Sequence, residues 1–236
     1  MHNTWIILAC AVTLGACGGG YDGTQPQRAL TTVTVSALPA VEVGQFDTAR
    51  VVALDQYGMP IATGPVSWSS SKPTVVGIGP ASGILLALSP GTAQISATLD
   101  GKVAQRTVTV FTSPIRVNEI RANGNAPGGW VELFNPTEAP IELSGWTVTN
   151  GNVFQNFALP VGTTIPAFGF FVIDESSLSG GLGATDAVHV FSRFGVQVDG
   201  FAWVTDVATS FGRCTDGSGV FVTTTAPSKG TSNVCP

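Results

Sequence analysis

The sequence is poor in charge and rich in residues that interrupt helices. Only 11% of its 236 residues are charged, less than half of the roughly 25% that is usual for globular proteins. Because 44% of the residues are hydrophobic, the chain is not intrinsically disordered. The 29 Gly and 15 Pro exclude a protein built from long helices. The length predicts one or two domains.

Groups for catalysis are equally scarce. The only histidines are His2, in a segment that we expect to be removed, and His189, where a solvent-facing strand position requires no special role. The chain contains no G-x-S-x-G, P-loop or H-E-x-x-H motif. Ser69 and Lys72 have S-x-x-K spacing, but that motif needs a helix and Pro73 follows directly. We therefore expect a protein that is not an enzyme and has no cofactor.

The formal net charge of −5 argues against a surface that follows nucleic-acid phosphates. Residues 31–112 hold four basic and four acidic side chains, whereas residues 115–236 hold five basic and ten acidic ones. The negative charge therefore belongs to the C-terminal half, and we expect no nucleic acid among the partners.

The N-terminus begins with a short apolar run, Trp5 to Leu14. It is too short for the roughly 20 residues of a membrane-spanning helix and is typical of a signal peptide. The run ends in Leu14-Gly15-Ala16-Cys17, which resembles the lipobox of bacterial lipoproteins. The alternative, an ordinary secretory signal with a chance cysteine, stays open.

The lipoprotein resemblance implies a signal peptide over 1–16, lipid on Cys17 and a flexible tether over 17–30. The protein would then be exported and held to the bacterial envelope by its N-terminal lipid. Because Gly18 rather than Asp follows the cysteine, the resemblance implies the outer membrane.

Two of the four cysteines remain after this processing, since Cys10 leaves with the signal peptide and Cys17 carries lipid. Cys214 and Cys235 would then lie in an oxidising compartment, where a lone pair most simply forms a disulfide. Two free thiols are the alternative. A metal site is disfavoured because neither cysteine has a Cys or His at ligand spacing.

Beyond residue 29 the pattern is that of short β-strands. Apolar and polar residues alternate with period two over 32–37 and 92–98, and Gly, Pro, Asn and Asp separate the runs. Asp100-Gly101 follows the second of these runs directly and predicts a hairpin turn. We expect an all-β protein made of antiparallel sandwiches.

Residues 31–112 carry these motifs in order: Val41-Glu42-Val43-Gly44, Asp55-Gln56-Tyr57-Gly58, Val66-Ser67-Trp68-Ser69-Ser70, Ser82-Gly83 and Pro90-Gly91-Thr92-Ala93. This segment resembles the bacterial immunoglobulin-like domain of group 2. The resemblance implies that Trp68 fills the core and that Asp55 and Gly58 form a turn. It also implies a spacer or adhesive stalk.

Residues 113–236 carry a second set: Val117-Asn118-Glu119-Ile120, Trp130-Val131-Glu132-Leu133-Phe134-Asn135, Ile141-Glu142-Leu143-Ser144-Gly145-Trp146 and Ser210-Phe211-Gly212-Arg213. This segment resembles the lamin tail domain, another immunoglobulin-like sandwich. The fold class implied by the two resemblances is a pair of tandem immunoglobulin-like antiparallel β-sandwiches, with Pro114 at the joint.

Glu119 and Glu132 have the residue type of a paired acid and base for glycoside hydrolysis. We favour a structural role, because acids flanked by strand residues need hydrogen bonds or a charge partner when buried. Arg213 is the partner that the sequence suggests.

Two further groups are candidates for ligand binding. Asp174, Glu175, Asp186 and Asp199 could supply oxygen ligands for Ca²⁺, although no spacing pattern joins them and we favour solvated loop acids. Phe201, Trp203 and Trp130 could form a platform for sugar rings if exposed, although burial in the core is favoured.

The function that follows is non-enzymatic: a monomeric, lipid-anchored surface protein for adhesion or scaffolding. Its first domain would be a spacer, and its second would recognise or tether a surface protein or a polysaccharide. The alternative is a carbohydrate-binding accessory lipoprotein, which requires exposed aromatic rings. A hydrolase or nuclease has the least support.

Overall fold

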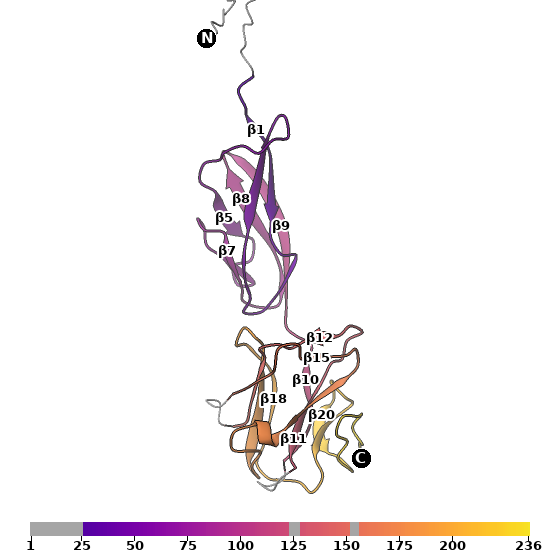
Figure 1. Cartoon of the computed structure of the whole chain (residues 1–236). Helices are drawn as coiled ribbons and strands as arrows, with labels where there is room; N and C mark the ends of the chain where they lie inside the picture. Colours follow the sequence, from indigo (N-terminus) through magenta and orange to yellow (C-terminus); the bar gives the residue numbers. More distant parts are fainter. Residues whose placement is uncertain (1–25, 123–127, 152–155) are drawn as a thin grey trace, which may run out of the picture.

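A computed structural model describes residues 26–122, 128–151 and 156–236. They form two β-sandwiches arranged end to end (Figure 1). Within these residues the only helical element is the 3₁₀ turn η1, Glu175–Ser177. None of the described helical structure has the length and apolar character needed to cross a bilayer. The predicted all-β fold class is confirmed.

The first sandwich contains nine strands in three sheets, ordered β1-β4, β2-β9-β8-β5 and β3-β7-β6. The strands are β1 Leu30–Ser36, β2 Ala40–Glu42, β3 Phe46–Thr48, β4 Arg50–Asp55, β5 Ser67–Ser70, β6 Val76–Ile78, β7 Ile84–Ala87, β8 Gly91–Leu99 and β9 Lys102–Phe111. One pairing departs from the antiparallel prediction: β2 runs parallel to β9. β1 pairs with β4, and after Pro39 the chain continues as β2, which pairs with β9. Residues 30–42 therefore contribute strands to two different sheets.

The core of the first sandwich follows from strand alternation. Along β8, Ala93, Ile95 and Ala97 are fully buried, and they pack with Trp68. Asp100 and Gly101 have φ of 47° and 76°, the left-handed conformation that a two-residue hairpin turn requires at both central positions. The predicted hairpin and the predicted core position of Trp68 are confirmed.

The second sandwich has sheets ordered β16-β11-β10-β19-β20, β14-β13-β17-β18 and β12-β15. Its strands are β10 Arg116–Arg121, β11 Trp130–Phe134, β12 Ile141–Glu142, β13 Thr147–Thr149, β14 Phe157–Ala158, β15 Thr164–Ile165, β16 Phe170–Asp174, β17 Asp186–Phe191, β18 Gln197–Trp203, β19 Phe211–Cys214 and β20 Val220–Thr223. Every residue of β11 is buried. Because successive side chains of a strand point to opposite faces, both faces of this strand must be covered.

The joint between the sandwiches is short, since β9 ends at Phe111 and β10 begins at Arg116. Gly44, in the turn after β2, lies close against Val196, in the turn before β18. The approach is so close that any larger residue at position 44 would clash, since its Cβ would lie 2.7 Å from Val196 Cγ2. Burial raises the pKa of Glu42 beside this joint, and the nearby positive charge of Arg193 opposes the shift. The domain boundaries 31–112 and 113–236 stay a prediction.

Replacing Trp68 with Ala should lower the free energy of unfolding of the first sandwich by about 3–5 kcal/mol, because it opens a cavity in the core. Phe46→Ala is the matched control, since Phe46 is 65% exposed and its loss should change stability by less than about 0.5 kcal/mol. Chemical denaturation of both variants measures the difference. Equal losses would contradict the core assignment.

Candidate functional site

A polar region with many hydrogen bonds lies on the outer face of the five-stranded sheet β16-β11-β10-β19-β20 of the second sandwich. Val117 and Ile120 of β10 enter the hydrophobic core, whereas the residues between them, Asn118 and Glu119, face the opposite side. A bulge between Val117 and Glu119 makes Asn118 an extra residue in the strand, which allows two successive side chains to reach one face. With Glu132 of β11, these two residues form what we call the polar face.

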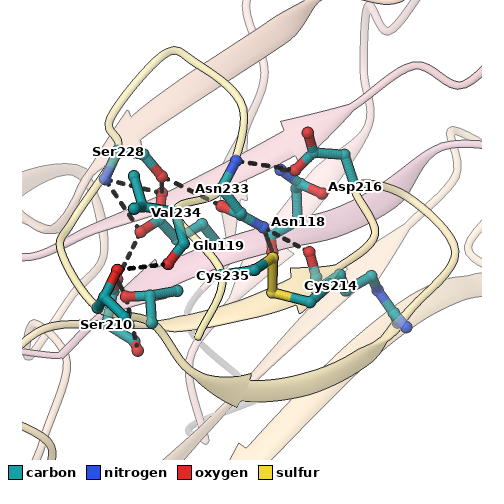
Figure 2. Close-up of a disulfide and its surroundings, with 12 residues drawn as sticks. Asn118, Glu119, Ser210, Cys214, Asp216, Ser228, Asn233, Val234 and Cys235 are labelled. Carbon is teal, nitrogen blue, oxygen red and sulfur yellow. Dashed lines mark hydrogen bonds between the residues drawn. A yellow bond between two sulfur atoms is a disulfide. The ribbon is translucent and has the colours of Figure 1, made fainter.

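The C-terminal tail, residues 225–236, covers the polar face (Figure 2). Glu119 is fully buried, and its Oε1 accepts hydrogen bonds from Ser210 Oγ at 2.5 Å and from the Ser228 backbone N at 3.1 Å. Its Oε2 accepts one from Ser228 Oγ at 2.7 Å. Both carboxylate oxygens therefore have donors from the serines that enclose them.

Glu132 is also fully buried and is bound at both oxygens. Asn118 Nδ2 donates to Oε1 at 3.0 Å, and the Gly230 backbone N donates to Oε2 at 2.6 Å. Burial raises the pKa of Glu132 to about 7; these two hydrogen bonds oppose the shift, and the negative charges of Glu119 and Asp216 add to it.

Asparagine and aspartate side chains connect the tail to the sheet. Asn233 Nδ2 donates to the backbone oxygens of Asn118 at 3.1 Å and Arg213 at 2.9 Å. Asp216 Oδ1 accepts from Asn118 Nδ2 and from the Asn233 backbone N. The tail thus extends the hydrogen bonding of β10 and β19 without forming a strand of its own.

A disulfide closes this arrangement. Cys214, the last residue of β19, is bonded to Cys235 near the end of the tail, with their Cα atoms 5.9 Å apart (Figure 2). The predicted bridge is confirmed. It fastens the tail covalently beside the polar face.

The predicted partner of the buried carboxylates is wrong. Arg213 does not contact Glu119 or Glu132 but donates from Nη2 to both oxygens of Asp199, at 3.1 and 3.2 Å. Its guanidinium also lies 4.5 Å from the centroid of the Phe221 ring. Side-chain hydroxyls and backbone amides of the tail take the role that we assigned to the arginine.

The two carboxylates are therefore placed for stability rather than for acid–base chemistry. A general acid or base must be within hydrogen-bond reach of a substrate, but Glu119 and Glu132 are both 0% exposed. Access to either would require the bridged tail to leave the sheet.

Of the four acids considered for Ca²⁺, Asp174 and Glu175 border one pocket, whereas Asp186 and Asp199 each lie in a different set of contacts. Asp174 pairs with Lys229, and Asp199 pairs with Arg213. Asp186 accepts hydrogen bonds from backbone N–H groups at 151, 183 and 187. Over the described ranges no cluster of three or more His, Cys, Asp or Glu side chains is placed to hold a metal ion.

The aromatic candidates are packed inward. Trp130 and Trp203 are only 2% and 4% exposed, and Trp203 Nε1 donates to Gly183 O at 2.9 Å. Phe201 is half-buried and stacks on Phe221, with ring centroids 4.0 Å apart. These rings offer no flat exposed face for a sugar. His189 is half-buried in β17 rather than solvent-facing.

One pocket of about 490 Å³ was not anticipated from the sequence. Two glycine pairs and the start of η1 surround it, and its lining residues are Gly128, Gly129, Asp174, Glu175, Ser176, Leu178, Gly180 and Gly181. We call it the distal pocket, because the pairing of Trp130 with Asp174 places it at the end of β11 away from the joint. Among the described residues, Glu175 Oε2 is buried there and has no hydrogen-bond partner. The nearest signal in the sequence was the pair Gly180-Gly181 shortly after Asp174-Glu175.

Residues 111–205 match the Lamin Tail Domain family. The match ends before β19, so most donors to the polar face lie outside it. No curated protein matches the chain. The resemblance of residues 31–112 to group 2 immunoglobulin-like domains stays a prediction.

Solved structures with some similarity include domains 4 and 5 of the S-layer protein SbsC, at 25% identity and TM-score 0.31, covering 36% of this chain and 54% of that chain. This chain therefore spans about half of that fragment. SbsC domains 5–6 match at 17% identity and TM-score 0.32, covering 77% and 100%. The Yersinia pseudotuberculosis adhesin InvE matches at 15% identity and TM-score 0.27, covering 78% and 68%. At these TM-scores the similarity assigns no function.

Removing the disulfide by Cys214→Ser together with Cys235→Ser should lower the free energy of unfolding by about 3 kcal/mol, because the unfolded chain regains the freedom of the closed loop. Chemical denaturation measures the loss. Reductant should produce the same loss in the wild-type protein and none in the double variant. A reductant effect on the double variant would show that the loss has another origin.

Stability should fall as pH rises from about 4.5 to about 7. The pKa of Glu132 is raised from 4.5 to about 7 in the folded protein, so over this range the folded state holds a proton that the unfolded chain has released. The stabilisation of the folded state by this bound proton is fully present below pH 4.5 and is lost as the pH rises through 7. It amounts to about 3 kcal/mol, at 1.36 kcal/mol per pKa unit.

Glu132→Gln should flatten this part of the pH profile of unfolding, because glutamine does not titrate. The exposed residue Glu142 provides the control: Glu142→Gln should keep the wild-type slope. If both variants keep that slope, Glu132 is not the group responsible.

Proposed function

We propose that this protein is an exported, lipid-anchored and non-enzymatic component of the bacterial outer membrane surface. In this proposal lipid on Cys17 holds the protein to the membrane, the first sandwich is a spacer, and the second recognises or tethers a partner in adhesion or scaffolding. Cys17 lies outside the described residues. The observation that best supports this proposal is the end-to-end arrangement of the two sandwiches (Figure 1).

Strand pairing places the two connections of the first sandwich at opposite ends. The N-terminal chain enters at Leu30, which pairs with Asp55. The second sandwich follows Phe111, at the end of β9 opposite the Asp100-Gly101 turn. Because the chain enters the first sandwich at one end and leaves it at the other, this domain holds the segments before and after it apart. A spacer requires this property.

The chemistry of the second sandwich supports a binding role over a catalytic one. Its two buried carboxylates accept hydrogen bonds from the tail, from Asn118 of β10 and from Ser210, and Asp199 is paired with Arg213. The distal pocket lies at the end farthest from the first sandwich. We expect the partner, a surface protein or a polysaccharide, to contact this end.

The disulfide supports export. Structural disulfides persist in oxidising compartments and are rare in the reducing cytosol, and the bond between Cys214 and Cys235 fits a protein that leaves the cytoplasm. Burial of Trp130 and Trp203, with Phe201 half-buried against Phe221, favours this proposal over a carbohydrate-binding accessory lipoprotein, which requires exposed aromatic rings.

Replacing Cys17 with Ala should move the protein from the membrane fraction to the soluble fraction, because the acylated residue is lost. Cell fractionation with immunoblotting measures the distribution. Cys10→Ala, in the apolar run of the signal, is the control and should leave the protein in the membrane fraction. A Cys17→Ala protein that stays with the membrane would overturn the proposed anchor.

Antibodies against residues 113–236 should bind intact cells if the second sandwich faces outward. Binding that appears only after the outer membrane is permeabilised would contradict a surface role while leaving the lipid anchor in place.

A further inference from the structure

The end of the first sandwich that faces the tether carries an exposed apolar turn. Tyr57 and Met59 are 57% and 58% exposed, and they lie on either side of Gly58, whose φ of 73° is left-handed. With Pro26, Gln27, Arg28 and Asp55 they line a groove of about 580 Å³. We call Tyr57, Gly58 and Met59 the tether-end turn.

The tether-end turn is held in a fixed conformation. Asp55 Oδ1 accepts hydrogen bonds from the backbone N of Tyr57 at 2.8 Å and of Met59 at 2.9 Å. The Asp55 backbone N donates to Met59 O, and Gly58 N donates to Asp55 O. The two apolar side chains are therefore presented by a preorganised loop, which lowers the entropy lost when they are buried against a partner.

The N-terminal chain is attached to the same place. Arg28 Nε donates to Asp55 Oδ2, and its Nη2 donates to Pro60 O. Gln56 accepts from the Ala29 backbone N and donates to Gln27 O. From Cys17 to Pro26 the sequence advances nine residues, which can span at most about 30 Å. A lipid on Cys17 would therefore keep this end close to the bilayer.

Charge at this end does not oppose approach to lipid. Burial of Asp55 raises its pKa, but the hydrogen bonds from Met59, Arg28 and Tyr57 outweigh it and hold the pKa below the ordinary value. The carboxylate is thus ionised and neutralised by Arg28. In the neighbouring hairpin turn, Asp100 is followed closely by Lys102, so the described charges at this end balance.

We propose that the tether-end turn inserts Tyr57 and Met59 into the headgroup region of the same bilayer that holds the lipid on Cys17. Tyrosine suits this position because its ring is apolar and its hydroxyl is polar. Methionine adds a flexible apolar side chain. The proposal rests on the proposed lipid anchor. A second contact beside the anchor restricts tilting, so the first sandwich directs the second away from the membrane.

The test uses the full lipidated chain carrying Met59→Cys, labelled with an environment-sensitive fluorophore. The wild-type chain offers no other free thiol after lipidation, since Cys214 and Cys235 are bridged. The protein is placed in vesicles of phosphatidylethanolamine and phosphatidylglycerol that contain a spin-labelled lipid. Quenching of the label should be several-fold stronger than at Val161→Cys, the control on the second sandwich, where the side chain is 96% exposed.

Tyr57→Ser in the labelled Met59→Cys protein should reduce the quenching several-fold, because the aromatic anchor is lost, while flotation with the vesicles stays unchanged. The hydrogen bonds that hold the turn use the backbone of residue 57, so the variant is expected to fold, and its denaturation curve checks this.

The outcomes separate the two proposals. A wild-type chain that does not float with vesicles overturns the lipid anchor and this inference together. A chain that floats but shows equal quenching at positions 59 and 161 overturns this inference alone. A position 59 label that is shielded from water but not quenched, with dimers found on sedimentation, would assign the turn to a second copy of the chain and likewise overturn the bilayer contact.

Discussion

Burial of two carboxylates on the polar face is the constraint on which the second sandwich depends. A carboxyl group in the interior is costly unless hydrogen bonds replace those to the water that it loses. At Glu119 these donors are Ser210 and Ser228, and at Glu132 they include the Gly230 backbone N. The tail must therefore occupy one position for the sheet to be stable. The disulfide and the hydrogen bonds of Asn233 keep it there.

The same reasoning explains how so few charges organise a protein of this size. Asp55 orders a turn through two backbone N–H groups, and Asp186 orders another through three. Asp199 binds both Arg213 and the Val117 backbone N, and so connects β18 to β10. In each case a carboxylate satisfies backbone donors that no strand partner reaches. These three acids thus contribute to the folded structure.

Features set by neighbouring residues could be predicted from the sequence, and features set across the sheet could not. The Asp100-Gly101 turn follows from local pattern, and the core position of Trp68 was implied by the family resemblance of the segment around it. The donors to Glu119 lie 91 and 109 residues away, and nothing near the glutamate indicates them. Charge alone suggested Arg213 for this role. The bulge at Asn118 changes which side chains face the tail, and a sequence with regular alternation gives no sign of it.

The sequence did not indicate the parallel pairing of β2 with β9. In a molecule whose two sandwiches lie end to end, this pairing has a mechanical consequence. A pull applied at Leu30 and at the second sandwich would draw β2 toward the N-terminus and β9 toward the C-terminus. Because the two strands are parallel, this pull acts along them, and the pairs Ala40–Thr109, Val41–Val110 and Glu42–Phe111 resist together rather than one after another. Backbone bonds from Thr109 N to Pro39 O and from Val43 N to Phe111 O extend the same contact at both ends. The pairing would therefore reinforce the first sandwich against a pull along the line that joins its two ends.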